Sequence, residues 1–282
     1  MTSPVDSAPS TAPELVLEAG RADAHYWRDL WRYRELLGFL AWRDITVRYK
    51  QTILGAAWAL LQPAITLVVF TFVFGHLAHM PSGDVPYPLL VMAGLLPWQL
   101  FANALSSASG SLVSNTHLIS RVYFPRLVVP LSALAVALID FLIVGLLYVA
   151  LCAWWNFWPD WRVLLLPFFT LLGLLAALGA GLWLTALTVR FRDFRFIVPF
   201  LLQLGVFLSP VGFSTSNVPS WRLLFSFNPM VAVIDGFRWC LLRGQAPYYV
   251  PGLLIGVGVT AALVVSGLWY FRRTERGFAD LI

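Results

Sequence analysis

Residues 43–63 read RDITVRYKQTILGAAWALLQP, and this stretch decides how the rest of the chain is interpreted. Three cations, Arg43, Arg48 and Lys50, lie within its first eight residues, and no Asp, Glu, Lys or Arg follows until Asp84. A basic collar directly before a long uncharged apolar run is typical of the place where a chain leaves the cytoplasm and enters a bilayer. The stretch therefore predicts a membrane protein whose first span follows the collar.

The overall composition supports the same class. Of the 282 residues, 59% are hydrophobic and 12% are charged, whereas a soluble domain carries about 25% charged residues. The length leaves room for about six spans of about 20 residues joined by short loops. The net charge is +5, and its cations cluster beside apolar runs, which favours contact with a membrane surface and argues against nucleic acid.

The apolar runs predict an all-α, polytopic fold with six transmembrane helices in one domain, residues 51–282. The predicted spans lie near 57–79, 87–113, 127–154, 163–189, 196–213 and 250–271. Residues 1–23, whose first part is rich in Ser, Pro, Ala and Thr, predict a disordered cytoplasmic tail.

Residues 24–50 form a separate predicted unit between the tail and the spans. Apolar residues repeat at intervals of three and four over 24–46, while Arg28, Arg32 and Glu35 share another face. This pattern predicts a basic amphipathic helix in the membrane surface, followed by the collar. A helix packed on a partner protein is an alternative that is compatible with the first interpretation.

Cation counting predicts the orientation. With the amino terminus inside and six spans, all but four of the 19 Lys and Arg residues fall on the cytoplasmic side. The exceptions are Arg162, Arg222, Arg238 and Arg243. The positive-inside rule then places both termini in the cytoplasm and the protein in the cytoplasmic (inner) membrane.

Residues 214–248 predict an irregular external segment. Two short apolar pieces are separated by Asn228-Pro229, and a seventh crossing there would place Arg272-Arg273 outside, against the charge rule. We therefore expect short re-entrant half-helices between the fifth and sixth spans. Non-helical backbone at that depth is tolerated only against protein or water, so these pieces predict a pore mouth.

Few residues carry recognisable chemistry. No G-x-x-x-x-G-K-[ST] phosphate loop is present, because the only lysine is Lys50. We expect no catalytic and no metal site, since His76 and His79 alone are weak candidates for metal ligands. Phe70 and Phe74 share a face of the first span, and they are the candidates for a pore lining on which sugar rings could stack.

Asp140 is the one acid deep inside a predicted span, which makes it a functional candidate by default. No Arg or Lys is expected at matching depth in another span. Proton coupling, which would need a relay or a partner, and a protonated or hydrogen-bonded packing role both stay open.

Several motifs occur in one order along the chain. After residues 43–63 come GLLPW (94–98), LISRVYFPR (118–126), RFRDF (190–194), FNPM (227–230) and ERGFAD (275–280). Together they resemble the membrane permease subunits of polysaccharide ABC exporters of the type 2 class, which serve O-antigen, teichoic acid and capsule export. The resemblance covers residues 25–282 and does not name the glycan.

The resemblance implies a homodimer of six-span subunits docked on two copies of a cytoplasmic ABC ATPase. ATP and Mg would bind that partner, so this chain would be a transport subunit without cofactor, and its substrate a lipid-linked glycan. Residues 115–126 and the loop 190–195 would meet the ATPase through Leu118, Ile119, Arg121, Tyr123, Phe124, Arg126, Arg190, Arg192 and Asp193. The helix before the collar would frame the lipid headgroup, with Arg28, Arg32, Arg43, Arg48 and Lys50 near the phosphate.

Other functions of a polytopic membrane protein have sequence features of their own. A secondary carrier would be expected to show internal repeats, and none is apparent. A membrane glycosyltransferase or polymerase would require loops with paired acids or clustered histidines, which the short loops mostly lack. Within the ABC class, an exporter of a drug or a small lipid is the alternative.

Overall fold

The computed structural model describes residues 22–50, 55–119, 121–122, 124–215, 219–246 and 248–278. Within these ranges it leaves undescribed the side chains of residues 22–25, 55–56, 220 and 276. The described residues form helices and connecting turns without a strand, which confirms the predicted all-α class. Most of the predicted tail, residues 1–21, lies outside the described residues.

The α-helices are α1 (Ala22–Arg32), α2 (Arg34–Lys50), α3 (Gly55–Phe70), α4 (Tyr87–Ser114), α5 (Thr116–Ile119), α6 (Val128–Trp154), α7 (Leu166–Arg190), α8 (Phe194–Leu208), α9 (Arg222–Phe225), α10 (Pro229–Leu241) and α11 (Val250–Thr274). A π-helical segment, η1 (Thr71–Leu77), continues α3. Short 3-10 turns are η2 (Trp161–Leu165), η4 (Pro219–Trp221) and η5 (Glu275–Gly277).

Five described helical segments are long and apolar enough to cross a membrane. They are Ala57–Leu77, Tyr87–Ser114, Val128–Trp154, Trp161–Arg190 and Val250–Thr274. The predicted span at 196–213 corresponds to α8, which has 15 residues and ends at Leu208. A helix of that length is about 22 Å long, against about 30 Å of hydrocarbon. It ends there because Ser209 precedes a proline and is extended.

Prolines begin several of these helices. Each of α4, α7, α10 and α11 has a proline in its first turn, where the missing N–H would be unpaired in any case. At α10 the Asn228 side chain also accepts a hydrogen bond from the Met230 main-chain nitrogen at 3.0 Å. Asn228-Pro229, interpreted above as a separator, is therefore the cap and first residue of a helix.

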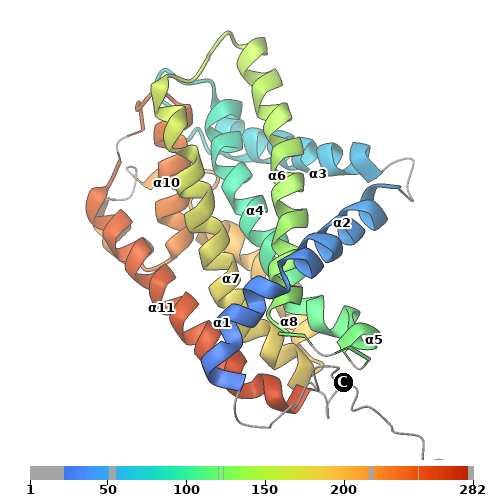
Figure 1. Ribbon diagram of the computed structural model, residues 1–282. Coiled ribbons are helices and arrows are strands. Elements are labelled where there is room, and N and C mark those ends of the chain that lie inside the picture. Colours follow the sequence, from blue (N-terminus) through green and yellow to red (C-terminus); the bar gives the residue numbers. More distant parts are fainter. Residues whose placement is uncertain are drawn as a thin grey trace, which may run out of the picture.

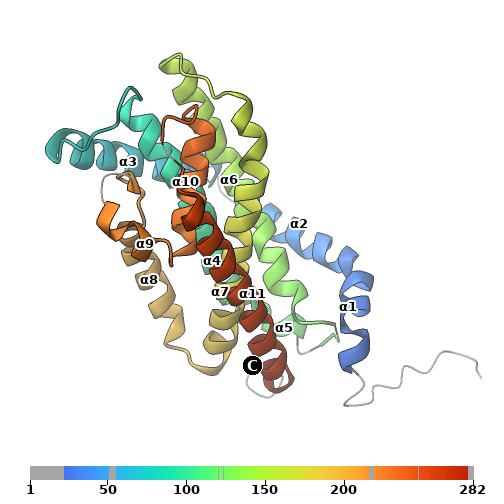
Figure 2. The same ribbon diagram turned by 90° about the vertical axis from the view of Figure 1, so that its left-hand side faces the viewer.

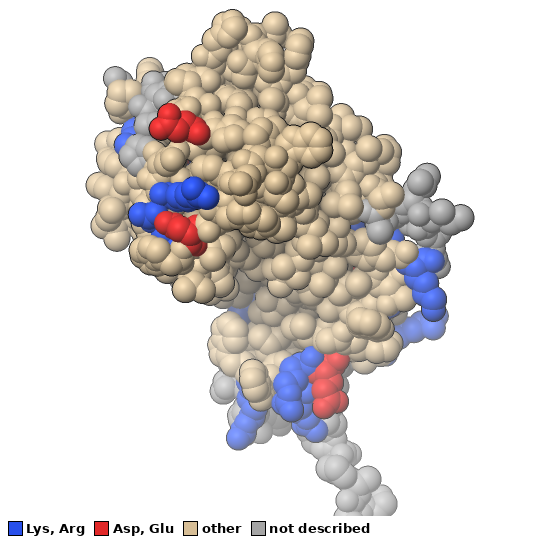
Figure 3. All heavy atoms as spheres, turned by 90° about the horizontal axis from the view of Figure 1, so that it is seen from above, with Lys and Arg blue, Asp and Glu red and all other residues tan. Residues whose placement is uncertain are grey.

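Among the five long apolar helices, α4 is the most buried. It lies at the centre of the bundle and packs against α6, α7 and α10, while α11 packs along α7 (Figure 1). Figures 1 and 2 both place α1, α5 and the C-terminus of α11 at one end, which we call the basal end. The loop between α6 and α7 lies at the opposite, apical end. Seen from above, the apical surface is mostly uncharged, with a few charged side chains toward its rim (Figure 3).

Glycines allow α7 and α11 to touch backbone to backbone. A Cβ atom added at Gly179 on α7 would lie 2.7 Å from the main-chain carbon of Leu263 and from the nitrogen of Val264. Gly267 on α11 faces the main chain of Gly179 in turn. Close approach of this kind is how small residues hold membrane helices together.

The predicted surface helix is two helices that join at Tyr33, and main-chain hydrogen bonds continue across the joint. Apolar and polar residues segregate along α1 but not along α2. From the basal end α2 rises obliquely against α6, and α3 then runs across the bundle in both views (Figures 1 and 2). The C-terminal end of α2 is thereby carried to the middle of α6.

Candidate functional site

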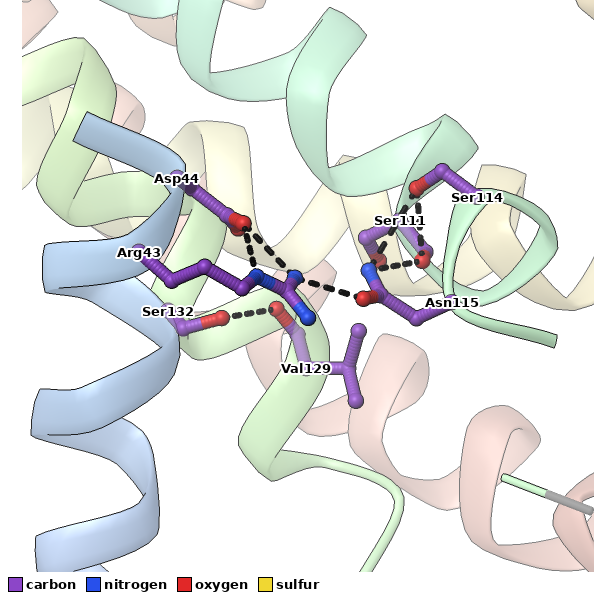
Figure 4. A network of polar contacts seen from close by, with 7 residues as sticks. All are labelled: Arg43, Asp44, Ser111, Ser114, Asn115, Val129 and Ser132. Atoms are coloured by element: carbon purple, nitrogen blue, oxygen red, sulfur yellow. Dashed lines mark hydrogen bonds and ion pairs between the residues drawn. The ribbon is translucent and has the colours of Figure 1, made fainter. Parts of the chain in front are cut away.

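The first polar contact between α2 and the bundle is made by Arg43 (Figure 4). Its guanidinium donates to the Asn115 side-chain oxygen at 2.6 Å and is held by the Asp44 carboxylate at 2.6 and 2.9 Å. The Asn115 amide donates in turn to the main-chain oxygen of Ser111 at 2.9 Å. Arg43 thus joins α2 to the residue that caps α4 and opens the predicted coupling segment.

A second contact at the basal end gathers around Glu275, just after α11. The Tyr26 hydroxyl on α1 donates to the Glu275 carboxylate at 3.1 Å, and the Arg272 guanidinium lies 4.6 Å from the Tyr26 ring centre. Burial, followed by the nearby Glu275 carboxylate, raises the pKa of the Tyr26 hydroxyl, so this group stays a donor. Arg126 donates to the main-chain oxygen of Glu275 and lies over the ring of Phe278.

The residues predicted to meet the ATPase divide into buried and exposed groups. Ile119 and Phe124 are buried in a basal apolar cluster, and Leu118 packs against it. Arg121 is exposed, and Tyr123 lies outside the described residues. Among the described residues of this segment that were predicted to meet the ATPase, Arg121 is therefore the one with an exposed side chain.

The loop between α7 and α8 offers a second exposed group at the basal end. Arg190 ends α7, and Arg190, Arg192 and Asp193 are all exposed. The Arg190 guanidinium lies 5.4 Å from the centre of the Phe191 ring. This loop and Arg121 are the predicted coupling residues whose side chains are available to another protein.

Arg48 and Asp140 form an ion pair halfway along α6. The Arg48 guanidinium lies 2.7 Å from the Asp140 carboxylate, with side-chain exposures of 45% and 4%. The same carboxylate accepts a hydrogen bond from the Tyr49 hydroxyl and one from the Asn103 amide at 3.4 Å. Asp140 thereby connects α2, α4 and α6.

The cation that reaches Asp140 belongs to α2 and not to another long apolar helix. The expectation above considered only cations inside spans, and it placed the helix before the collar in the membrane surface. Because α2 rises along α6, Arg48 reaches Asp140 from outside the apolar runs. The sequence did show that Arg48 lies just before a long uncharged run. It could not show that Asp140 is the partner of Arg48, because that depends on the path of α2.

The five cations predicted at the lipid headgroup do not form one cluster. Arg28 and Arg32 are exposed on α1, and Lys50 is exposed at the end of α2. Arg43 and Arg48 are engaged by Asn115 and Asp140 respectively.

Near the apical end, Arg238 on α10 forms a buried polar centre that the sequence analysis missed. Its side chain has no exposed surface and donates to three main-chain oxygens, those of Leu90 at 3.3 Å, Val211 at 2.7 Å and Phe213 at 2.6 Å. One turn away, Asp235 accepts a hydrogen bond from Thr215 at 2.7 Å. The predicted external half-helix is thus a buried helix that fixes the turn after α8 onto α4.

The two candidate pore aromatics pack inside this chain. Phe70 is 8% exposed, and its ring centre lies 5.4 Å from that of Phe74 and 6.2 Å from that of Phe207 on α8. The Phe74 ring also lies against Gly212, where an added Cβ would stand 2.8 Å away. In the single chain these rings therefore fill the space between α3, α8 and the following turn.

Metal ligands do not gather in the described part of the chain, where no group of three or more His, Cys, Asp or Glu residues could hold an ion. His76 stacks on Phe72 at 6.1 Å between ring centres. The polar groups that these residues do bring together are ion pairs and hydrogen bonds between helices.

Comparison with known proteins places this geometry in a family. The profile of the ABC-2 type transporters matches residues 35–242, which is well over half of the chain. The chain belongs to the ABC-2 type transporter family. This membership confirms the permease family that the sequence motifs indicated, and it identifies the helical bundle as the membrane part of a transporter.

Several relatives of this ABC-2 type transporter carry names. The O-antigen export system permease protein RfbA of Myxococcus xanthus is 30% identical over 90% of this chain and 98% of its own length. The protein of the same name from Klebsiella pneumoniae is 26% identical over 88% and 95%. The polysialic acid transport protein KpsM of Escherichia coli is 27% identical over 72% and 79%.

Proposed function

We propose that this ABC-2 type transporter is the membrane subunit of an exporter that moves a lipid-linked polysaccharide across the cytoplasmic membrane. One observation carries the proposal: the similarity to an O-antigen export permease extends over 90% of this chain and 98% of the relative. The similarity therefore extends over the whole membrane-spanning part of the chain. The relative named for polysialic acid transport supports the same class of cargo.

ATP hydrolysis belongs, in this proposal, to a separate cytoplasmic subunit that binds ATP and Mg. The chain has no phosphate loop of the G-x-x-x-x-G-K-[ST] form. Arg121 and the exposed loop 190–193 form the docking surface at the basal end. Arg126, Ile119 and Phe124 act behind that surface, because their side chains are occupied within the fold.

Two copies of the chain form the transport unit in this proposal. Apolar side chains along α3, including Trp58, Ile65 and Val68, are about half exposed or more in the single chain. The resemblance implies a homodimer, and in this proposal the second copy covers part of such a face. The basal end faces the cytoplasm with both termini, since a cytoplasmic basal end keeps most cations inside.

The lipid phosphate is first met, in this proposal, by the exposed cations of α1. Arg28 and Arg32 lie on the helix whose polar and apolar residues segregate. A cation at an anionic membrane surface contributes about 1 kcal/mol, and a guanidinium can bind phosphate oxygens in a bidentate manner.

Reconstitution tests the proposal. The chain is placed in proteoliposomes alone and with its partner ATPase, and both ATP hydrolysis and translocation of a fluorescent lipid-linked oligosaccharide are measured. We expect no hydrolysis above background from the chain alone, and translocation only with the partner. Translocation of drugs or short lipids but no glycan would favour the alternative exporter, and ATP turnover by the lone chain would contradict the two-subunit arrangement.

A further inference from the structure

Asp140 is the only Asp, Glu, Lys or Arg that lies away from the ends of the five long apolar helices. It is residue 13 of the 27 in α6, which puts it about 18 Å from the start of the helix. Its partner, Arg48, keeps 45% of its side-chain surface exposed, whereas Asp140 keeps 4%. The pair therefore has a covered anion and an accessible cation at the middle depth of the bundle.

The guanidinium lies against an apolar helix. Asp140 is the only charged residue of α6, Val128–Trp154. A cation in such surroundings gains strongly from an anion, because little water competes for it.

We propose that Arg48 is a binding site for the phosphate of the lipid carrier, and that Asp140 occupies the site as a substitute anion when no substrate is present. The inference rests on the proposed function, because the anion is that of the exported lipid. During transport the phosphate replaces the carboxylate on the guanidinium, and the carboxylate takes the guanidinium back when the lipid leaves.

The contacts of Asp140 make this exchange feasible. When Arg48 turns to a phosphate, the carboxylate keeps the hydroxyl of Tyr49 and the amide of Asn103 as donors. A buried carboxylate with two donors is far less costly than one with none. The exchange thus needs a rotation of one arginine side chain and no separation of α2 from α6.

A purely structural ion pair between α2 and α6 can be distinguished from an exchange site, in which phosphate replaces the Asp140 carboxylate on Arg48. For a brace, removing either charge weakens the same structure, so both variants change substrate binding in the same direction. For an exchange site, Asp140 competes with the ligand and lowers the fraction of Arg48 that can bind it. Removing the competitor then strengthens binding, while removing the cation weakens it.

The experiment measures binding of a fluorescent polyprenyl pyrophosphate to the full chain in nanodiscs of uncharged lipid. The variants are Asp140→Asn, which keeps the shape and both neutral donors, Arg48→Gln, and the matched control Arg34→Gln on the exposed first turn of α2. We expect the dissociation constant to fall about fivefold in Asp140→Asn and to rise about tenfold in Arg48→Gln, the size of one charge-assisted contact. Arg34→Gln should stay within about twofold of the wild type, as expected of an exposed charge far from the ligand.

The possible outcomes distinguish a failure of the exchange site from a failure of the proposed function. Opposite shifts, with thermal stability of both variants near that of the wild type, support the exchange site. Shifts in the same direction, or none, overturn it even if the wild type prefers the pyrophosphate to the unphosphorylated polyprenol. If phosphatidylglycerol displaces the probe as effectively as polyprenyl pyrophosphate does, the ligand of Arg48 is not specifically the carrier lipid. A wild type without preference for the pyrophosphate contradicts the proposed function itself.

Discussion

Tyr26 donates a hydrogen bond to Glu275 across 249 residues of sequence, and the oxygen-to-oxygen distance is 3.1 Å. The contact joins the first described helix to the turn after the last one. Because Arg126 binds the main-chain oxygen of the same Glu275, the end of the coupling segment belongs to this contact as well. Tyr26, Arg126 and Glu275 therefore form one connected polar group at the basal end, and a change at one of them should affect the other two.

Arg126 and Arg121 should respond differently to charge reversal. Arg126→Glu removes the bond to Glu275 and the contact with the Phe278 ring, so we expect a loss of about 1–2 kcal/mol of stability. Arg121→Glu changes an exposed side chain, so stability should stay within about 0.5 kcal/mol. Thermal unfolding in detergent gives the first comparison, and ATPase stimulation by the partner should fall in Arg121→Glu. Equal stability of the two variants would contradict the assignment of Arg126 to the fold.

Arg43 and Asn115 should be energetically coupled. The guanidinium is only partly exposed and bonds the Asn115 oxygen at 2.6 Å, so Arg43→Gln, Asn115→Ala and the double variant should show an interaction energy of about 1 kcal/mol. The measurement is a double-mutant cycle on unfolding. Pairing Asn115→Ala with Arg34→Gln, at the far end of the same helix, serves as the control and should be additive. Additivity in the Arg43 cycle would mean that the contact contributes nothing to the docking of α2.

Arg238 should be the most sensitive cation of the chain to substitution. Arg238→Met preserves volume but leaves three main-chain oxygens without the donor they share, which costs about 3 kcal/mol or more. Arg243→Met removes an exposed guanidinium that bonds the Trp158 oxygen at 2.6 Å, and it should cost less than about 1 kcal/mol. The yield of folded protein and the midpoint of thermal unfolding measure both. A tolerated Arg238→Met would show that the turn after α8 is held by other groups.

Gly94 should not accept even a methyl group. A Cβ there would lie 2.9 Å from the Arg238 guanidinium nitrogen and 3.0 Å from the Val211 oxygen, so Gly94→Ala should cost about 1–3 kcal/mol by overpacking. Gly145→Ala on α6 is the matched control, because nothing lies within 4 Å of its Cβ. The control should be neutral or stabilising by about 0.5–1 kcal/mol, since alanine favours the helix. Equal unfolding midpoints for the two variants would refute the close approach.

The sequence predicted most of the long helices, because long apolar runs are a local signal. Its errors concern tertiary partners. Local composition could not show that α2 rises along α6, so the expectation for Asp140 considered only cations in other spans and left out Arg48. Nor could it show that Arg238 turns inward, since three carbonyl oxygens from distant segments make its burial possible. The predicted fifth span continued to residue 213, whereas α8 ends at Leu208, before the extended Ser209.

The contact between α7 and α11 at Gly179 has a mechanical consequence. Main chain lies against main chain there, with no flexible side chain between the helices to absorb a displacement. We consequently expect the two helices to move as one rigid body. The exposed loop that begins at Arg190 follows the C-terminal end of α7, and Glu275 follows the C-terminal end of α11. We therefore expect a displacement of that loop to be passed on to the bonds that Tyr26 and Arg126 make with Glu275.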